Sequence, residues 1–385
     1  MKSIAYFDNA ATTFPKPEEV YAFTDSFYRE CGVNVGRGQH KLAARASALV
    51  ADTREMLLNL FHCSNKRVVF AHTATEALNT ILNGLDWYDG INVYISPFEH
   101  NAVTRVLHHL CSIYKLNVFT LAFDKERFEY DLNGIKTQFA DKTPNVVVVS
   151  HASNVCGVIA PIAEIAFLSK KYDAVNIVDM CQTAGLLNVD LSLDTIDYAV
   201  FAGHKTLYAP FGVAGFVCLP DVCLKPMLFG GTGVDSANQA LPNTLPERYE
   251  VGSPNIMAIA GLYSALHWIE KTGITEIYRR EQDNRSRLIK LLAAYYNIRT
   301  IPAFKTENCI GVVSCVFEGY ESDSIGQVLS DKNVAVRVGL HCAPTAHRFL
   351  GSFPGGTVRF SVSCFNDDDD FAILNNALWY IQENS

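Results

Sequence analysis

The chain holds 385 residues, of which 49% are hydrophobic and 19% charged, and it carries a formal net charge of −8 at pH 7. This length predicts about two domains and a large core. The acidic balance, which no basic block offsets, excludes nucleic acid as the main partner. No apolar run approaches the roughly 18 residues of a membrane span, and the N-terminus lacks a signal-peptide pattern, so we expect no membrane partner.

The 11 cysteines are an odd number spread over the whole chain, which does not resemble a disulfide framework. No Cys-x-x-Cys pair occurs, and the spacings of Cys218 with Cys223 and of Cys309 with Cys315 are not common for zinc. We therefore expect buried, unpaired cysteines, no metal site and a reducing, cytoplasmic location.

Near the N-terminus, a short apolar element runs into a polar turn, Asp8-Asn9-Ala10-Ala11-Thr12-Thr13. Farther along, a strand predicted at residues 68–70 leads into His72-Thr73-Ala74-Thr75-Glu76, which opens a helix. Such a turn presents backbone N–H groups and the helix dipole to an anion, so a phosphate fits there. The spacing of Thr73 and Glu76 also fits a capping box, and both interpretations can hold together.

The next two predicted strands each end in a polar segment. Residues 93–96 are followed by His100, an imidazole that could stack on a flat ring, although a plain loop histidine is the alternative. Residues 145–150 form a β-branched run that is typical of a strand buried on both faces of a parallel sheet. Asn154 follows closely after the end of that strand.

A further buried strand, residues 174–178, ends in Asp179-Met180-Cys181-Gln182. An acid at the end of an apolar strand requires a partner. A pyridinium nitrogen would be a suitable partner for Asp179, and Gln182 could then donate to the hydroxyl of the same ring. An aspartate that caps a helix or forms an ion pair is the alternative.

Lys205 lies in Gly203-His204-Lys205, a short stretch between the apolar runs 198–201 and 213–219. A lysine between two buried strands is costly unless its charge is paired or used. Partial burial makes the amine a better nucleophile for an aldehyde, and the aldehyde that this setting indicates is pyridoxal phosphate. The alternative is a lysine whose side chain merely reaches out of a turn into solvent.

Several of these polar residues share one position relative to the predicted strands. Each falls at or just beyond the end of a successive strand: Thr75, His100, Asn154, Asp179 and Lys205. In open α/β sheets that edge binds ligands, so the set predicts a cofactor site better than any single member does.

Helices are expected at 256–272 and 274–296, and the last hundred residues predict a smaller α/β domain. In that domain a helix is expected at 322–329 and strands at 310–317, 334–338 and 357–362. Cys342 follows the second of these strands, beside His341 and near Arg337, in a stretch read as a loop from 341 to 350. Arg359, in the third strand, could bind a carboxylate through two parallel hydrogen bonds from its guanidinium group.

Taken together, these motifs resemble the cysteine desulfurase and selenocysteine lyase family of class V aminotransferase-fold enzymes over nearly the whole chain. The matching stretches are 8–13, Thr75-Glu76, Glu99-His100, 153–157, Asp179 with Gln182, 203–205, and Arg337 through 342–344. The resemblance implies an α/β fold, the PLP-dependent transferase fold type I (aspartate aminotransferase-like). Its large domain, residues 16–260, would contain a mainly parallel seven-stranded sheet, and residues 1–15 with 261–385 would form the smaller domain.

The resemblance also implies roles for individual residues. The catalytic residues would be Lys205, which binds the cofactor aldehyde and later shuttles a proton, Cys342, and His100, which stacks on the ring. Other cofactor-binding residues would be Ala74, Thr75 and His204 at the phosphate, Asn154, Asp179 and Gln182 at the ring, and Ser253 reaching in from a neighbouring subunit. Substrate would contact Ala11, Asn154, Arg337 and Arg359.

Three details depart from the family pattern. Ala74 interrupts a turn that often has consecutive threonines, and Ala202 stands where a serine commonly precedes the Gly-His-Lys stretch. Each change can remove a phosphate hydrogen bond, a loss of about 1–3 kcal/mol if nothing replaces it. The short segment after Cys342 resembles the compact loop of the branch with selenocysteine lyases and would limit the reach of this thiol.

The function that this resemblance implies is a PLP-dependent cysteine desulfurase, which converts L-cysteine to L-alanine and passes the sulfur to Cys342 as a persulfide. Alternatives are another class V enzyme (a selenocysteine lyase, aminotransferase or epimerase) or a non-catalytic subunit that binds a sulfur-acceptor protein. The presence of Lys205, Asp179 and His100 argues against the non-catalytic subunit. A homodimer, a sulfur-acceptor protein and a link to iron–sulfur cluster assembly are further expectations from the resemblance.

Overall fold

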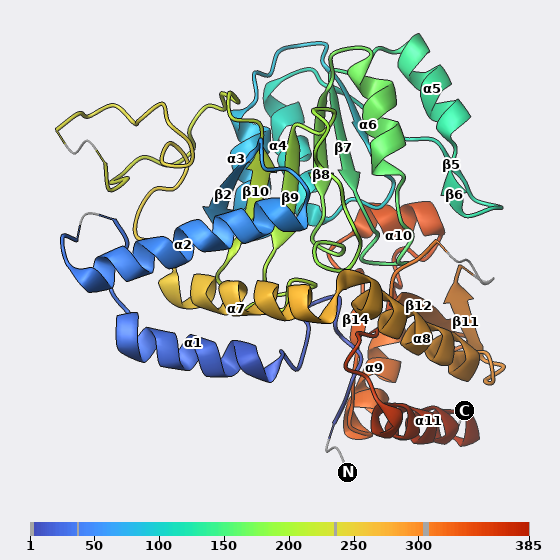
Figure 1. Cartoon of the computed structure of the whole chain (residues 1–385). Coiled ribbons are helices and arrows are strands. Elements are labelled where there is room, and N and C mark those ends of the chain that lie inside the picture. The colour runs from blue at the N-terminus through green and yellow to red at the C-terminus, as the bar shows by residue number, and fades with distance from the viewer. Residues whose placement is uncertain (1–3, 37, 235–236, 303–307, 385) are drawn as a thin grey trace.

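The computed structural model describes residues 4–36, 38–234, 237–302 and 308–384. Its largest sheet has seven strands in the order β2-β10-β9-β8-β7-β3-β4 (Figure 1). The bounds are β2 (Arg67–Ala71), β10 (Ala214–Cys218), β9 (Tyr198–Ala202), β8 (Val175–Asp179), β7 (Val146–Ser150), β3 (Asn92–Ile95) and β4 (Asn117–Thr120). Only β10 runs antiparallel to its neighbours, so the predicted mainly parallel seven-stranded sheet is confirmed.

The strands of this sheet are buried on both faces. In β7, Val147 and Val149 belong to one hydrophobic core, while Val146 and Val148 belong to the core on the opposite face. One face is covered by α3 (Ala74–Gly84) and α4 (Asn101–Ile113). The other is covered by α2 (Lys41–Leu60), α5 (Leu132–Asp141), α6 (Ile162–Lys170) and α7 (Ile256–Thr272), with α1 (Glu18–Cys31) packed outside α7. Helices on both faces explain why these strands read as continuous apolar runs.

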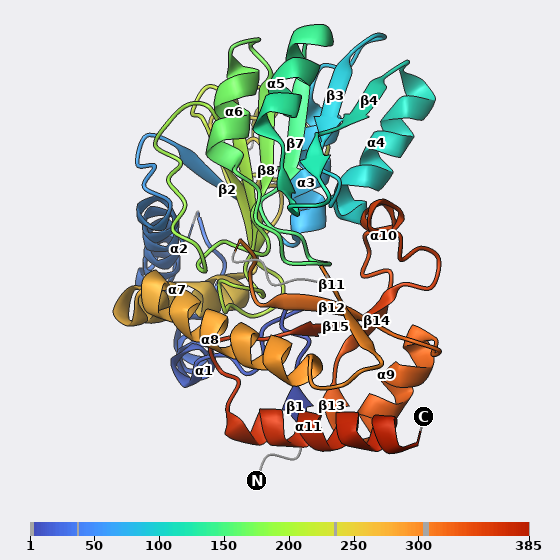
Figure 2. The same cartoon turned by 90° about the vertical axis from the view of Figure 1, so that its right-hand side faces the viewer.

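A second, antiparallel sheet has the order β11-β12-β15-β14 (Figure 2). Its strands are β11 (Ile298–Ile301), β12 (Val312–Phe317), β15 (Thr357–Ser361) and β14 (Arg337–Gly339). The helices α8 (Ile274–Leu292), α9 (Ser322–Asp331) and α11 (Asp368–Glu383) contribute to the separate core beside it. A hairpin of β5 (Phe123–Asp124) and β6 (Glu129–Tyr130) and the helix α10 (Pro344–Leu350) complete the chain.

The N-terminal segment joins the smaller part of the molecule. β1 (Ala5–Tyr6) pairs in parallel with β13 (Val334–Ala335), and Ala5 and Phe7 belong to the core of that part. The proposed division at residue 260 falls within α7, which runs beneath the large sheet and leads into α8 (Figure 2). Among the described residues, no helix combines the length and apolar character needed to cross a membrane.

Two local predictions were wrong. The expected strand 334–338 is two strands in different sheets, because β13 pairs with β1 while β14 pairs with β15. The stretch read as a loop from 341 to 350 contains α10, which begins at Pro344. Proline is well tolerated in the first turn of a helix, so a proline there was a start signal rather than evidence for a loop.

Candidate active site

Polar residues from successive strand ends meet at the carboxyl edge of the large sheet. Asp179 is the last residue of β8, and its Oδ1 accepts the amide of Cys181 at 2.9 Å. His100 caps α4 just after β3, with Nδ1 accepting the amide of Ala102 at 3.0 Å. Burial lowers the pKa of His100, with Lys205 acting in the same direction and Asp179 in the opposite one. Because Nδ1 accepts the Ala102 amide, the neutral ring of His100 carries its proton on Nε2. The pKa contributions also show that Lys205 and Asp179 lie within electrostatic reach of His100.

Lys205 lies in a tight connection between β9 and β10. The Gly203 amide donates to the carbonyl of Val213 at 3.0 Å, and the Ala209 amide donates to the carbonyl of Gly203 at 2.8 Å. A Cβ on Gly203 would lie 2.6 Å from the Val213 oxygen, so only glycine fits this close approach. Lys205 is half-buried, and its Nζ makes no hydrogen bond to any described residue. Its amine is therefore available for a ligand.

The N-terminal polar turn packs directly on this connection. The hydroxyls of Thr12 and Thr13 donate to the carbonyls of His204 and Lys205, at 2.9 and 3.0 Å. Gln182, predicted near the cofactor ring, donates from Nε2 to the carbonyl of Ala10 at 2.9 Å. These contacts bring the segment that contains Ala11 beside the site.

Lys16 is a neighbour of this site that the sequence did not reveal. Its Nζ donates to the carbonyl of His204 at 2.6 Å, and burial lowers the pKa of Lys16 to about 7. The only local pattern is a lysine between two prolines, which carries no chemical signal. Lys16 thus binds the backbone of the same connection that carries Lys205.

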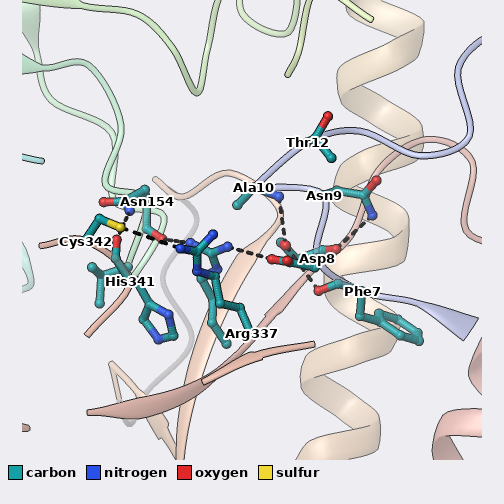
Figure 3. A network of polar contacts seen from close by, with 12 residues as sticks. Phe7, Asp8, Asn9, Ala10, Thr12, Asn154, Arg337, His341 and Cys342 are labelled. Carbon is teal, nitrogen blue, oxygen red and sulfur yellow. Dashed lines mark hydrogen bonds and ion pairs between the residues drawn. The ribbon is translucent and has the colours of Figure 1, made fainter. Parts of the chain in front are cut away.

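Two arginines face each other across β14 and β15, next to Cys342 (Figure 3). Arg337 lies opposite Arg359, and its Nη2 donates to the Sγ of Cys342 at 3.5 Å. Arg359 is 1% exposed; it donates to the carbonyl of Asn154 at 3.0 Å and to Oδ1 of Asp8 at 2.7 Å. Asp8 was part of a recognised motif without an assigned role, and the structure makes it the partner of Arg359.

Cys342 is exposed and is held by its backbone. Both His341 and Cys342 have positive φ angles, 47° and 57°, which are uncommon for residues other than glycine. The carbonyl of Cys342 accepts the amide of Asn101 at 2.7 Å, and that of His341 accepts Nδ2 of Asn154 at 2.7 Å. A cavity of about 490 Å³ is lined by Cys342 together with His100 and Thr75. The structure thus brings the predicted nucleophile to the predicted cofactor site.

A buried hydrogen-bond chain behind Cys342 was also missed. Ser314 Oγ donates to the carbonyl of Val155 at 2.6 Å, and Thr357 Oγ1 donates to Ser314 Oγ at 3.1 Å. Thr357 must therefore accept the 2.7 Å hydrogen bond from Nε2 of His341. Burial lowers the pKa of His341 to about 2, so its ring is neutral with the proton on Nε2.

Glu99 lies beneath His100 and connects two strand ends. Its carboxyl accepts the amide of Ser150 at 2.6 Å, the hydroxyl of Ser150 at 2.9 Å and the hydroxyl of Ser96. Burial raises the pKa of Glu99 to about 7. This acid fixes the end of β3 against the end of β7 and so positions His100.

The donor set fits pyridoxal phosphate. The amine of Lys205 suits its aldehyde, and the carboxylate of Asp179 suits its ring nitrogen. Ala74 and Thr75 form the first turn of α3, where amide N–H groups have no intrahelical acceptor. Nδ1 of His204 is buried without a hydrogen-bond partner among the described residues, which is a free position for a phosphate oxygen.

Ser253, another predicted cofactor residue, does not line the cavity of Cys342, His100 and Thr75. It lies in a separate cavity of about 500 Å³, whose lining also includes His72 and Glu76. Its predicted contact comes from a neighbouring subunit and stays a prediction.

Comparison with known proteins adds independent findings. Residues 5–374 match the family Aminotransferase class-V. A probable cysteine desulfurase of Methanothermobacter thermautotrophicus is 27% identical, with 98% of this chain and 94% of that protein aligned. One of Aeropyrum pernix is 30% identical, with the same shares covered. The solved apo structure of a cysteine desulfurase from Thermococcus onnurineus is similar with a TM-score of 0.89 and 27% identity, covering 99% of this chain and 95% of that one.

Proposed function

The chain belongs to the aminotransferase class-V family, and on that premise we propose that it is a PLP-dependent cysteine desulfurase that converts L-cysteine to L-alanine. The supporting observation is the position of Cys342, with its Sγ 3.5 Å from Arg337, in the same cavity as His100 and Thr75. An aminotransferase needs no thiol at this place, whereas sulfur removal needs a nucleophile there.

Each predicted residue has a role in this proposal. Bound pyridoxal phosphate supplies an electron sink for the substrate's reacting bonds. Lys205 would hold the cofactor aldehyde and move a proton at the substrate's α carbon, His100 would lie against the ring, and Asp179 would keep the ring nitrogen protonated. Ala74, Thr75 and His204 would hold the phosphate, Asn154 and Gln182 would lie near the ring, and a second subunit would supply Ser253.

The substrate carboxylate binds at the paired arginines. Arg359 is already oriented by Asp8 and by the carbonyl of Asn154, while Arg337 has no carboxylate partner among the described residues. Two arginines on paired strands, only one of which is bound to an acid, leave positive charge for a second carboxylate. Ala11, in the N-terminal polar turn, would contact the substrate.

Sulfur leaves the substrate through Cys342. Its thiolate attacks the substrate sulfur and forms an S–S bond, while the electron pair of the broken C–S bond stays on the substrate's β carbon. That carbon takes up a proton, alanine leaves, and the sulfur remains on Cys342 as a persulfide. A thiol reductant or an acceptor protein then removes it.

The test compares wild type with Cys342→Ala in the presence of pyridoxal phosphate, L-cysteine and dithiothreitol. Wild type should release alanine and sulfide in equal amounts, and Cys342→Ala should release neither. Cys223→Ala, another exposed cysteine, serves as the control and should behave as wild type. A protein with the cofactor's visible absorbance band that gives neither product would contradict the proposal.

Selenocysteine is a second candidate substrate, supported by the short segment after Cys342. Because α10 begins at Pro344 and Asn101 holds the Cys342 carbonyl, this thiol has little freedom to move. Faster release of selenide than of sulfide, measured side by side, would favour that substrate.

We also propose a cytoplasmic homodimer that passes sulfur to an acceptor protein. The dimer would bring Ser253 of one chain to the phosphate site of the other. Gel filtration should give about twice the chain mass of 42.6 kDa, and a mass of one chain would contradict the dimer.

A further inference from the structure

Arg285, on α8, is a buried charge that forms no hydrogen bond or ion pair with any described residue. Its side chain is 5% exposed. Its Nε is completely enclosed. Arginines this deep in a protein are normally paired, because an uncompensated buried charge is strongly unfavourable. The position is therefore incomplete without a further group.

The nearest acid does not neutralise this charge. Glu281 lies one turn earlier on α8, but its Oε1 accepts the amide of Gly311 at 2.7 Å. Burial raises the pKa of Glu281 to about 8, although Arg285 and the Gly311 amide act in the opposite direction, and the neutral form of this acid is therefore favoured near neutral pH. Glu276, another acid of this helix, is already bonded to Arg279 and Arg280.

Arg285 lines a cavity of about 360 Å³ between α8 and the small sheet. Most of the wall is aliphatic, formed by residues such as Ile289, Ile298, Ile301, Val312 and Val313. The polar lining includes Arg299 and Glu318, both exposed. We name this space the Arg285 cavity. It is separate from the cavity that contains Cys342 and His100.

We propose that the Arg285 cavity binds a small monocarboxylate with an aliphatic body. The planar guanidinium fork of Arg285 matches the two oxygens of a carboxylate, and the aliphatic wall would cover the body. The charges of the exposed Arg299 and Glu318 offset each other, which leaves one net positive charge, that of Arg285, for a singly charged anion to balance. The carboxylate would also supply the ion-pair partner that no described residue gives Arg285.

The experiment titrates 4-methylpentanoate into the holoenzyme and follows binding by calorimetry and by the thermal unfolding midpoint. Wild type should show saturable binding and a raised midpoint. Three other compounds should each bind at least about tenfold more weakly than 4-methylpentanoate. The amide 4-methylpentanamide lacks the negative charge, acetate lacks the aliphatic body, and inorganic phosphate carries more than a single charge.

Two variants locate the binding. Arg285→Met keeps the length of the side chain without its charge and should weaken 4-methylpentanoate binding at least about tenfold, with cofactor absorbance unchanged. Arg337→Met, at the proposed substrate site, should bind it as wild type does. If Arg285→Met does not fold, Ala293→Trp fills the cavity from its exposed wall and should abolish binding.

The proposal is overturned if wild type does not bind 4-methylpentanoate. It is equally overturned if Arg285→Met or Ala293→Trp binds it unchanged, or if binding is lost in Arg337→Met, because the anion would then occupy the substrate site. None of these outcomes depends on whether the enzyme removes sulfur from cysteine.

Discussion

Thr357 links the segment that carries Cys342 to the small sheet through one hydroxyl group. It accepts a hydrogen bond from His341 at 2.7 Å and donates one to Ser314 at 3.1 Å, and all three side chains are buried. Because both partners lie away from water, neither can find a substitute when this hydroxyl is lost.

Thr357→Val should therefore lower the free energy of unfolding by about 1–3 kcal/mol, since it keeps the shape of the side chain but leaves the Nε2–H of His341 without an acceptor and Ser314 with one hydrogen bond fewer. Urea denaturation measures this loss. Thr357→Ser keeps the hydroxyl and should lose less. Equal stability of Thr357→Val and wild type would show that these hydrogen bonds make no net contribution to the free energy of unfolding.

Several residues that the sequence identified share one property: each stands at or just beyond a strand end, which a local pattern reveals. Asp179, His100 and Lys205 were placed together for this reason, and they lie within electrostatic reach of one another. The partners Asp8 and Arg359, or Lys16 and His204, could not be found, because their contacts depend on how distant segments pack. The roles assigned to the predicted residues stay predictions until variants are measured.

At the scale of elements, one ion pair connects the helix α2 to the edge strand β2 of the large sheet. Arg54 of α2 binds Glu250 through two hydrogen bonds of 2.7 and 2.6 Å, and Glu250 also accepts the amide of Phe70 in β2 at 2.6 Å. Their side chains are 19% and 18% exposed. The pair joins α2, the edge strand β2 and the segment that leads to Ser253.

Glu250→Ala should lower the free energy of unfolding by about 3 kcal/mol, because it leaves Arg54 mostly buried without its acid. The measurement is again urea denaturation. Glu55→Ala, an exposed acid on α2, is the matched control and should change stability by less than about 0.5 kcal/mol. Replacing both members, Arg54→Met with Glu250→Leu, should recover part of the loss; a double variant no better than Glu250→Ala would contradict this account.

Elements with a strong local pattern were predictable, and those defined by distant partners were not. The helix expected at 256–272 is α7 with the same bounds, and the run 145–150 became β7. The split of 334–338 arises because β1, from the other end of the chain, pairs with its first half. Nothing within the segment itself encodes that pairing.

At the scale of the whole molecule, buried acids and buried histidines act on stability in opposite directions as pH changes. Burial raises the pKa of Glu281 to about 8 and that of Glu99 to about 7, so the folded state holds these protons more tightly than the unfolded state does. Their stabilising contribution is complete below the unfolded carboxyl pKa of about 4.3 and is lost as pH rises through the folded values. Burial lowers the pKa of His204 to about 3, so its contribution is instead present above about pH 6.5 and lost in acid.

Glu281→Gln isolates the acid contribution. The side chain still accepts the Gly311 amide but no longer titrates, so its free energy of unfolding should fall less than that of wild type between about pH 5 and 8. The difference should amount to several kcal/mol, on the order of 1.4 kcal/mol per unit of pKa shift. The free energy of unfolding of both proteins is measured by denaturation at each pH. If it changes with pH equally in both over this range, Glu281 is ionised in the folded state.

The antiparallel direction of β10 has a consequence for the dynamics of the Lys205 connection. Because β9 ends and β10 begins at the same edge, the connection is clamped at both ends by interior strands and closed by the amides of Gly203 and Ala209. These amides should exchange with deuterium only when the centre of the sheet opens, far more slowly than amides of frayed or exposed segments. Cofactor-free protein should then keep the lysine in its place and accept the cofactor without refolding.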